Sequence, residues 1–140
     1  MTDSVINVNQ TGRDGELWNG DGVEVMIDRN TTRPLAQNAN DYHLLVNTDN
    51  ALTDERGTGA GWDRSWTANA TTAVLRNGTG YTVEIAVPWA TIGGLPSLGA
   101  AIGLDVADND SDTPGQVTPY DWAGLTAFAQ PQKWGTLVLG

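Results

Sequence analysis

Apolar and polar residues alternate with a period of two along most of the chain, and short runs rich in glycine and asparagine interrupt the alternation. A period of two is typical of β-strands, because successive side chains then point to opposite faces. The alternation predicts strands over Val5–Asn9, Val23–Asp28, Tyr42–Asn47, Thr71–Leu75, Tyr81–Val87, Ala101–Ala107, Leu125–Phe128 and Thr136–Leu139. The one helical candidate, Trp89–Ile92, follows Pro88 and predicts a single turn.

The connections between the predicted strands carry turn residues. Asn77-Gly78-Thr79-Gly80 lies between two of these strands and predicts a β-hairpin. Many short strands with glycine-rich connections predict an all-β fold, an antiparallel β-sandwich of the jelly-roll kind. The 140 residues fit one domain spanning residues 1–140. A domain of this size buries roughly 68–70% of the surface of its unfolded chain, which is enough for a core.

Strand parity separates an apolar face from a mixed face in two of the predicted strands. In Val23–Asp28 the valines and the isoleucine share one face, and Glu24 lies on the other. In Tyr42–Asn47 the mixed face carries His43 and Asn47. We expect the apolar faces to form the core and the mixed faces to line a groove, with His43 as a surface residue rather than a catalytic one.

Charge and composition exclude several classes of function. Seventeen acidic residues against seven Lys and Arg give a formal charge of −10, which argues against nucleic acid and anionic membranes as partners. The absence of cysteine excludes thiol catalysis and cysteine–zinc sites, and one histidine excludes a multi-histidine metal site. No apolar run has the length of a transmembrane helix.

Six tryptophans stand against one phenylalanine, which suggests that some of the indole rings face outward. Trp66, Trp89 and Trp134 are expected in the core, whereas Trp18, Trp122 and Trp62 lie beside small or polar residues and are candidates for exposure. A flat indole suits the C–H patches of a sugar ring, and neighbouring carboxylates and amides suit its hydroxyls.

Four segments occur in an order that resembles the family 9 carbohydrate-binding modules. They are Leu17-Trp18-Asn19-Gly20-Asp21-Gly22-Val23-Glu24-Val25-Met26-Ile27-Asp28, Gly80-Tyr81-Thr82-Val83-Glu84-Ile85-Ala86-Val87-Pro88-Trp89, Gly103-Leu104-Asp105-Val106-Ala107-Asp108-Asn109-Asp110 and Pro131-Gln132-Lys133-Trp134-Gly135-Thr136-Leu137-Val138-Leu139. The resemblance covers nearly the whole chain. It also indicates that the chain begins after the family's first strands, as a piece of a longer protein.

The resemblance implies a sugar ring held between Trp18 and Trp122, with Glu24 and Asn47 binding its hydroxyls. We add Trp62 as a further candidate for carbohydrate binding. The sequence departs from the family pattern at Leu45, where an Arg is expected, and at Pro119, where an Asn is expected. An open groove, a flat platform and a closed pocket for a chain end therefore stay as alternatives.

An acidic cluster at Asp105, Asp108, Asp110 and Asp112 is the candidate metal site. Calcium prefers hard oxygen ligands of this kind, although the spacing does not match an EF-hand. Members of the resembling family often carry structural calcium. We therefore predict a structural Ca²⁺ and place its site in this segment.

The combined interpretation is a non-catalytic module that binds plant cell-wall β-glucan. β-1,4-Glucan and cello-oligosaccharides are the first choice, with xylan or mixed-linkage glucan as alternatives. The module is expected to be extracellular, appended to a secreted glycoside hydrolase. Two other classes stay open from the sequence: a small glycoside hydrolase or lyase, which needs two acids at catalytic separation, and a calcium-stabilised adhesion module.

Overall fold

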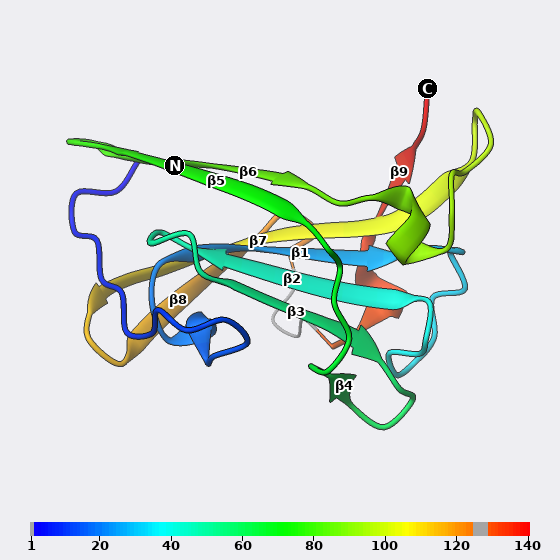
Figure 1. Cartoon of the computed structure of the whole chain (residues 1–140), viewed down its shortest axis with the longest axis horizontal. Helices are drawn as coiled ribbons and strands as arrows, with labels where there is room; N and C mark the ends of the chain where they lie inside the picture. The colour runs from blue at the N-terminus through cyan, green and yellow to red at the C-terminus, as the bar shows by residue number, and fades with distance from the viewer. Residues whose placement is uncertain (1, 125–128) are drawn as a thin grey trace.

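Two antiparallel β-sheets form the fold in the computed structural model, which describes residues 2–124 and 129–140. The larger sheet has the order β4-β3-β2-β1-β7-β8, and β9 also pairs with β7 (Figure 1). Its strands are β1 (Gly22–Asp28), β2 (Asp41–Asn47), β3 (Leu52–Gly57), β4 (Trp62–Asp63), β7 (Ala101–Thr113), β8 (Gln116–Asp121) and β9 (Gly135–Val138). The predicted all-β antiparallel sandwich is confirmed.

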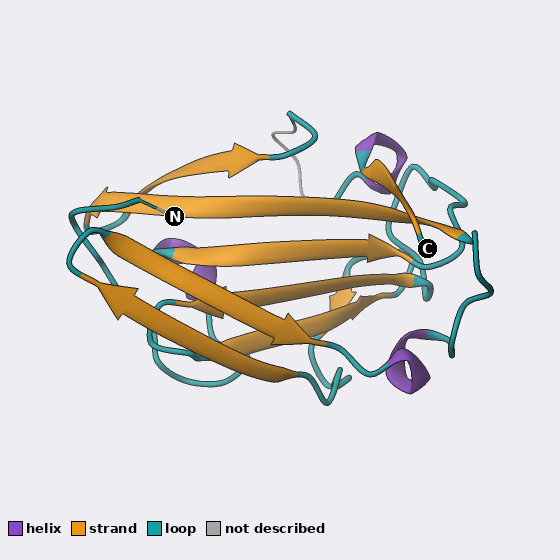
Figure 2. Cartoon of the chain, turned by 90° about the horizontal axis from the view of Figure 1, so that it is seen from above, coloured by secondary structure: helices purple, strands orange, loops and turns teal. Residues whose placement is uncertain are grey.

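The second sheet is the hairpin of β5 (Thr71–Asn77) and β6 (Gly80–Ala86), joined at the predicted turn. It lies over one face of the larger sheet, and its strands cross those of the larger sheet at an angle (Figures 1 and 2). Alternation along β1 and β2 sends the apolar side chains toward this layer. Leu44 and Val46 pack with the inward residues of the hairpin, whereas Ile27 and Tyr42 pack with Ile92 of the segment that follows it.

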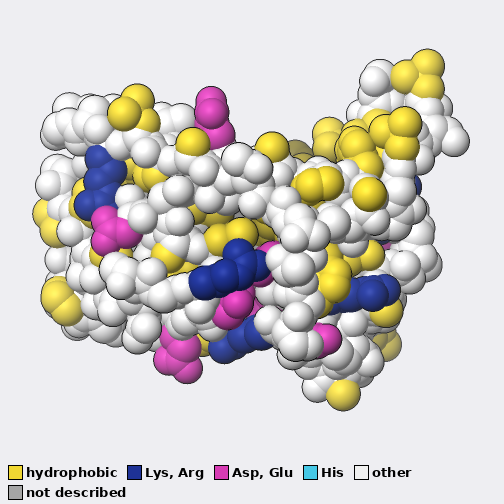
Figure 3. Space-filling view, viewed as in Figure 1, with side chains coloured by type: hydrophobic (Ala, Val, Ile, Leu, Met, Phe, Trp, Pro, Cys, Tyr) yellow, Lys and Arg dark blue, Asp and Glu magenta, His cyan; other side chains and the backbone are white. Residues whose placement is uncertain are grey.

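Three short 3-10 helices connect the strands: η1 (Leu17–Asn19), η2 (Trp89–Ile92) and η3 (Pro131–Lys133). The single turn predicted after Pro88 is η2. Within the described ranges, no helix is long and apolar enough to cross a membrane. Figure 3 shows basic side chains beside acidic ones on one face, and hydrophobic side chains at the projecting upper right corner, where Figure 1 places the loop between η2 and β7.

The predicted strand Val5–Asn9 is wrong, because this segment is irregular in the structure. It is held by the loop before β1 instead of a strand partner: Asp21 N–H donates to the Asn7 carbonyl at 2.9 Å. A Cβ on Gly20 would lie 2.7 Å from the same carbonyl oxygen. Strands β3, β4 and β8 were not predicted, and the predicted strand Leu125–Phe128 lies outside the described residues.

Candidate functional site

A pocket of about 310 Å³ lies on the face of the larger sheet to which Glu24 points. Alternation along β1 places this face away from the β5–β6 hairpin, which covers the other face (Figure 1). Strands β1 and β7 supply its floor, and η1 and β8 supply two sides. Its lining residues are Trp18, Asn19, Glu24, Ala107, Asn109, Gly115, Val117, Pro119 and Asp121. The structure therefore brings two of the sequence-predicted residues, Trp18 and Glu24, into one site.

The position of Trp18 follows from the residue before it. Leu17 is buried and packs with Leu45 and Ala51 on the pocket side of the sheet, which anchors the short helix η1. Trp18 also packs against this cluster and keeps part of its surface at the pocket. Leu45, where the family pattern expects an arginine, is thus part of the apolar support beneath the indole.

Glu24 points from β1 to the pocket floor, where its carboxylate is almost fully buried. The Asn109 side-chain amide donates to Glu24 Oε1 at 2.6 Å, and the His43 ring Nε2 lies 2.9 Å from Oε2. Burial alone would raise the pKa of Glu24. The hydrogen bond and charge of His43, together with the Asn109 amide, outweigh burial and lower the pKa, so Glu24 is a carboxylate.

The prediction of a surface role for His43 is wrong, because the ring is 2% exposed and lies between two carboxylates. Its Nδ1 is 2.7 Å from Glu55 Oε1, opposite the contact with Glu24. Burial lowers the pKa of a histidine, but the hydrogen bonds and charges of Glu24 and Glu55 raise the pKa of His43 to about 9. Both ring nitrogens therefore donate at neutral pH.

Glu55 extends the contacts of His43 to the edge of the sheet. Its second oxygen, Oε2, accepts a hydrogen bond from Arg64 Nε at 3.0 Å. The guanidinium carbon of Arg64 lies 4.7 Å from the centre of the Trp18 ring, which is a cation–π distance. Arg64 is not part of the pocket lining, so it supports the indole from outside the pocket.

The structure does not bring Trp122 to Trp18. Trp122 follows β8, is 62% exposed and lines a second groove with Val23, Val106 and Tyr120. Val23 lies on the opposite face of β1 from Glu24. The arrangement in which Trp18 and Trp122 hold one sugar from two sides is therefore absent from this structure.

Asn47 and Trp62 share the face of Glu24 but do not line the pocket. Asn47 is buried and closes the β2–β3 turn: its amide donates to the Gln10 carbonyl, and its Oδ1 accepts from the Ala51 backbone at 2.8 Å. Trp62 is half-buried against Trp134 and its neighbours, with its ring 5.6 Å from the His43 ring. Trp134 is buried, as expected.

The four aspartates predicted to bind calcium do not form one group. All four lie on strand β7, and alternation places Asp105 on the opposite face from Asp108 and Asp110. Asp112 lies where the pairing of β7 with β8 changes register. Asp105 accepts hydrogen bonds from two backbone N–H groups, and Asp108 accepts one from the Tyr81 hydroxyl at 2.6 Å. Asp112 is exposed.

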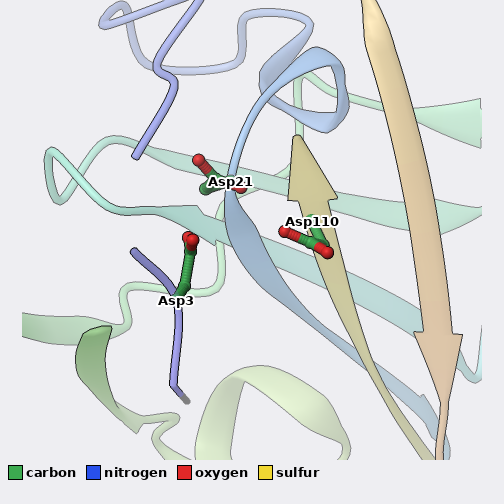
Figure 4. Close-up of side chains that lie close together, drawn as sticks. All are labelled: Asp3, Asp21 and Asp110. Carbon is green, nitrogen blue, oxygen red and sulfur yellow. The ribbon is translucent and has the colours of Figure 1, made fainter. Parts of the chain in front are cut away.

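Asp110 meets a different pair of acids, Asp3 and Asp21 (Figure 4). One carboxylate oxygen from each of the three lies within 4.8 Å of the others. Burial raises the pKa of Asp21, and the nearby charge of Asp3 adds to the rise. The second oxygen of Asp3 is buried without a hydrogen-bond partner in the described part of the chain. Three carboxylate oxygens are a partial set of the roughly six to eight oxygen ligands that calcium takes.

Sequence reasoning missed Asn109, Asp121, Glu55 and Arg64. Asn109 and Asp121 share a face with Glu24 in the register of β1, β7 and β8. Asn109 lies beyond the predicted strand Ala101–Ala107, and Asp121 lies in the unpredicted strand β8, so parity in the sequence alone did not reach them. Glu55 and Arg64 lie in segments without a clear apolar alternation, so nothing in the sequence indicated their strand or its facing side.

The fold and the site together are those of a small binding domain: a β-sandwich with a pocket on one face, lined by an indole, a carboxylate and an amide. The sequence pattern described as carbohydrate family 9 binding domain-like matches residues 1–140. Endo-1,4-beta-xylanase A of Thermotoga neapolitana is 35% identical over 125 residues, which are 87% of this chain. The corresponding xylanase of Thermoanaerobacterium saccharolyticum is 31% identical over 131 residues. The chain belongs to this carbohydrate-binding family and is therefore a binding module, not a catalytic domain.

Solved structures share the fold. A carbohydrate-binding module of family 9 from Caldicellulosiruptor kristjanssonii, in complex with cellotriose, superposes with a TM-score of 0.78 at 22% identity, over 99% of this chain and 65% of that one. A putative carbohydrate-binding protein from Bacteroides uniformis gives a TM-score of 0.68 at 13% identity, over 99% of this chain. The present chain spans about a tenth of the length of the xylanases that it matches.

Proposed function

We propose that the module binds β-1,4-glucan through the pocket between η1 and β8. One observation carries the proposal: Trp18 and the hydrogen-bonded pair Glu24–Asn109 face the same pocket in a chain of a carbohydrate-binding family. The flat indole offers a stacking surface, and the carboxylate and amide offer an acceptor and a donor to hydroxyls. Pockets of about 300–1,000 Å³ are typical of small-molecule sites.

Cello-oligosaccharides are the proposed ligands, ahead of xylan and mixed-linkage glucan. A related module has been solved with cellotriose, which supports this order. The xylanase relatives support a second proposal, that the module is joined to a secreted glycoside hydrolase and keeps that enzyme at the plant cell wall. Asn47 and Trp62 are not part of the proposed contact, since both are engaged within the fold.

A structural calcium ion is also proposed, with its site moved to Asp3, Asp21 and Asp110. The buried oxygen of Asp3 without a partner and the raised pKa of Asp21 support it. When bound, the ion would neutralise carboxylates that otherwise repel one another. The same three residues tie the N-terminal segment to β1 and β7, so the expected effect is on stability rather than on sugar contact.

Affinity electrophoresis tests the sugar proposal directly. The protein is run through gels that contain hydroxyethyl cellulose, mixed-linkage glucan, xylan or galactomannan, and the affinity for cellotriose is measured by calorimetry. We expect retardation in the cellulose gel, with Trp18→Ala weakening cellotriose binding at least tenfold, which corresponds to about 1.4 kcal/mol. Trp122→Ala is the matched control and should bind like the parent.

Two results would contradict the proposal. Unchanged migration of the parent in every gel would remove β-glucan and xylan as ligands. Loss of binding in Trp122→Ala together with full binding in Trp18→Ala would move the site to the groove beside Tyr120.

A further inference from the structure

A chain of four charged side chains crosses the larger sheet beneath the pocket, and we refer to Glu24, His43, Glu55 and Arg64 as the charged chain. They come from β1, β2, β3 and the residue that follows β4. Consecutive contacts are 2.9, 2.7 and 3.0 Å long. The first three members are between 2 and 6% exposed. The charged chain is therefore built into the fold and is not a surface ion pair.

At one end, the charged chain fixes an acceptor of the proposed site. A buried carboxylate without a compensating partner is costly, and the His43 imidazolium offsets much of that cost for Glu24. Because His43 holds Oε2 and Asn109 holds Oε1, the carboxylate cannot rotate without losing a hydrogen bond. Glu24 thus reaches the pocket as an ionised group with a set orientation.

At the other end, the charged chain fixes the aromatic wall. The Nε of Arg64 is bound to Glu55, which places the guanidinium over the Trp18 ring. Glu55 is in turn oriented by His43 through its other oxygen. The carboxylate and the indole, which are the two chemically distinct parts of the pocket, are therefore both connected to one buried histidine.

We propose that His43, Glu55 and Arg64 are positioning residues of the sugar site, which hold Glu24 and Trp18 in the geometry that binds. The inference rests on the proposed function of the pocket. None of the three lines the pocket itself. Their effect on affinity is indirect, through the orientation of the two residues that do.

The charged groups that face His43 are few. Glu24 faces it from β1, Glu55 from β3, and Arg64 lies beyond Glu55 in the segment after β4. Asp105, on the same face of β7, accepts two backbone N–H groups at Oδ1, while its Oδ2 is buried without a hydrogen-bond partner in the described part of the chain. Asp41 shares this face two residues before His43 on β2, and it is buried. Loss of the His43 proton is therefore expected to act first on Glu24 and Glu55.

Calorimetry with cellotriose tests the inference in three variants. Glutamine has no charge and its two N–H donors share one nitrogen, whereas an imidazolium donates from two separate ring nitrogens, so His43→Gln should weaken binding at least tenfold at pH 7. Arg64→Lys keeps the charge near Glu55 but removes the planar group over Trp18, and should weaken binding about threefold to tenfold. Arg76→Lys is the matched control, since Arg76 is similarly exposed and pairs with Asp49 at a distant site.

The pH dependence separates a positioning role from a purely structural one. Between pH 7 and 10 the affinity of the parent should fall as His43 loses its proton, and Arg64→Lys should keep this fall. His43→Gln should show a flat profile over the same range. Circular dichroism at each pH confirms that the sandwich is folded.

Unchanged cellotriose affinity in folded His43→Gln overturns the inference. If that variant does not fold, Arg64→Ala is the deciding variant, because the Arg64 side chain is partly exposed and its loss should leave the fold intact. Parent-like cellotriose affinity of Arg64→Ala overturns the inference equally. A parent that binds no sugar overturns the proposed function instead, so the two failures are distinguishable.

Discussion

The indole of Trp122 lies directly against Gly135 of strand β9. A Cβ on Gly135 would come within 2.6 Å of Trp122 Cζ3 and 3.2 Å of the Leu104 carbonyl oxygen. The glycine therefore leaves the space in which the ring lies, on the other side of the sheet from Glu24. This contact explains why an exposed tryptophan near the C-terminal end of β8 does not reach the pocket.

Gly135→Ala should lower the stability of the module by about 1–2 kcal/mol, because overpacking forces the indole or the β7–β9 pairing to shift. Denaturant unfolding measures the change. Gly78→Ala is the control, since a Cβ there meets nothing within 4 Å. In a double-mutant cycle, Trp122→Ala should remove most of the penalty. An equal penalty with and without the indole would show that the ring is not the obstacle.

Glu24→Gln should lower both stability and sugar affinity. The substitution leaves the His43 imidazolium with one carboxylate in place of two, and breaking a buried ion pair costs on the order of 3 kcal/mol. Thermal unfolding and cellotriose calorimetry measure the two effects. Glu84→Gln, an exposed substitution on the outer hairpin, should change neither. Parent-like stability of Glu24→Gln would argue against the buried pair.

Stability should decrease as the pH rises from about 6.5 to about 9. The pKa of His43 is raised from its ordinary value of 6.5 to about 9. A raised histidine pKa stabilises the fold fully below the unfolded value, and this contribution is lost as the pH passes the folded value. The shift corresponds to about 3 kcal/mol. Urea unfolding at pH 6, 7.5 and 9.5 should show the decrease, and His43→Gln should flatten it.

Calcium should raise the melting temperature after treatment with a chelator. An ion that binds only the folded state stabilises it by about 2.7 kcal/mol at a hundredfold excess over its dissociation constant. Asp110→Asn should reduce the rise, whereas Asp112→Asn should leave it, because Asp112 is not in the group of three. Identical melting curves with calcium and with magnesium would count against a calcium site.

The strands that the sequence predicted well are those with apolar side chains on one face and polar side chains on the other. Strands β1 and β2 and the β5–β6 hairpin are of this kind, and each was predicted to within one or two residues at its ends. Strand β3 was missed because Leu52–Gly57 carries polar residues on both faces. Those residues are buried through pairing, such as Glu55 with His43, and pairing between distant strands is not visible in a local pattern.

The candidate site was also predictable only where local sequence determines it. Trp18 and Glu24 belong to one short motif, so their proximity follows from local sequence. The burial of His43 depends on Glu55 from a strand that was not recognised, and the position of Trp122 depends on the space at Gly135. The burial of His43 and the position of Trp122 thus each depend on a residue that is distant in the sequence, and a local pattern does not show such a contact.

The charged chain also determines how the pocket responds to dissolved salt. Two carboxylates, one imidazolium and one guanidinium cancel, so the group beneath the pocket has no net charge. The whole protein carries a formal charge of −10 when its histidine is counted as neutral. Buried pairs are screened only weakly by ions, and a neutral sugar displaces no counterions. Binding of an uncharged glucan should therefore be nearly independent of ionic strength, which would let the module work unchanged across dilute and saline surroundings.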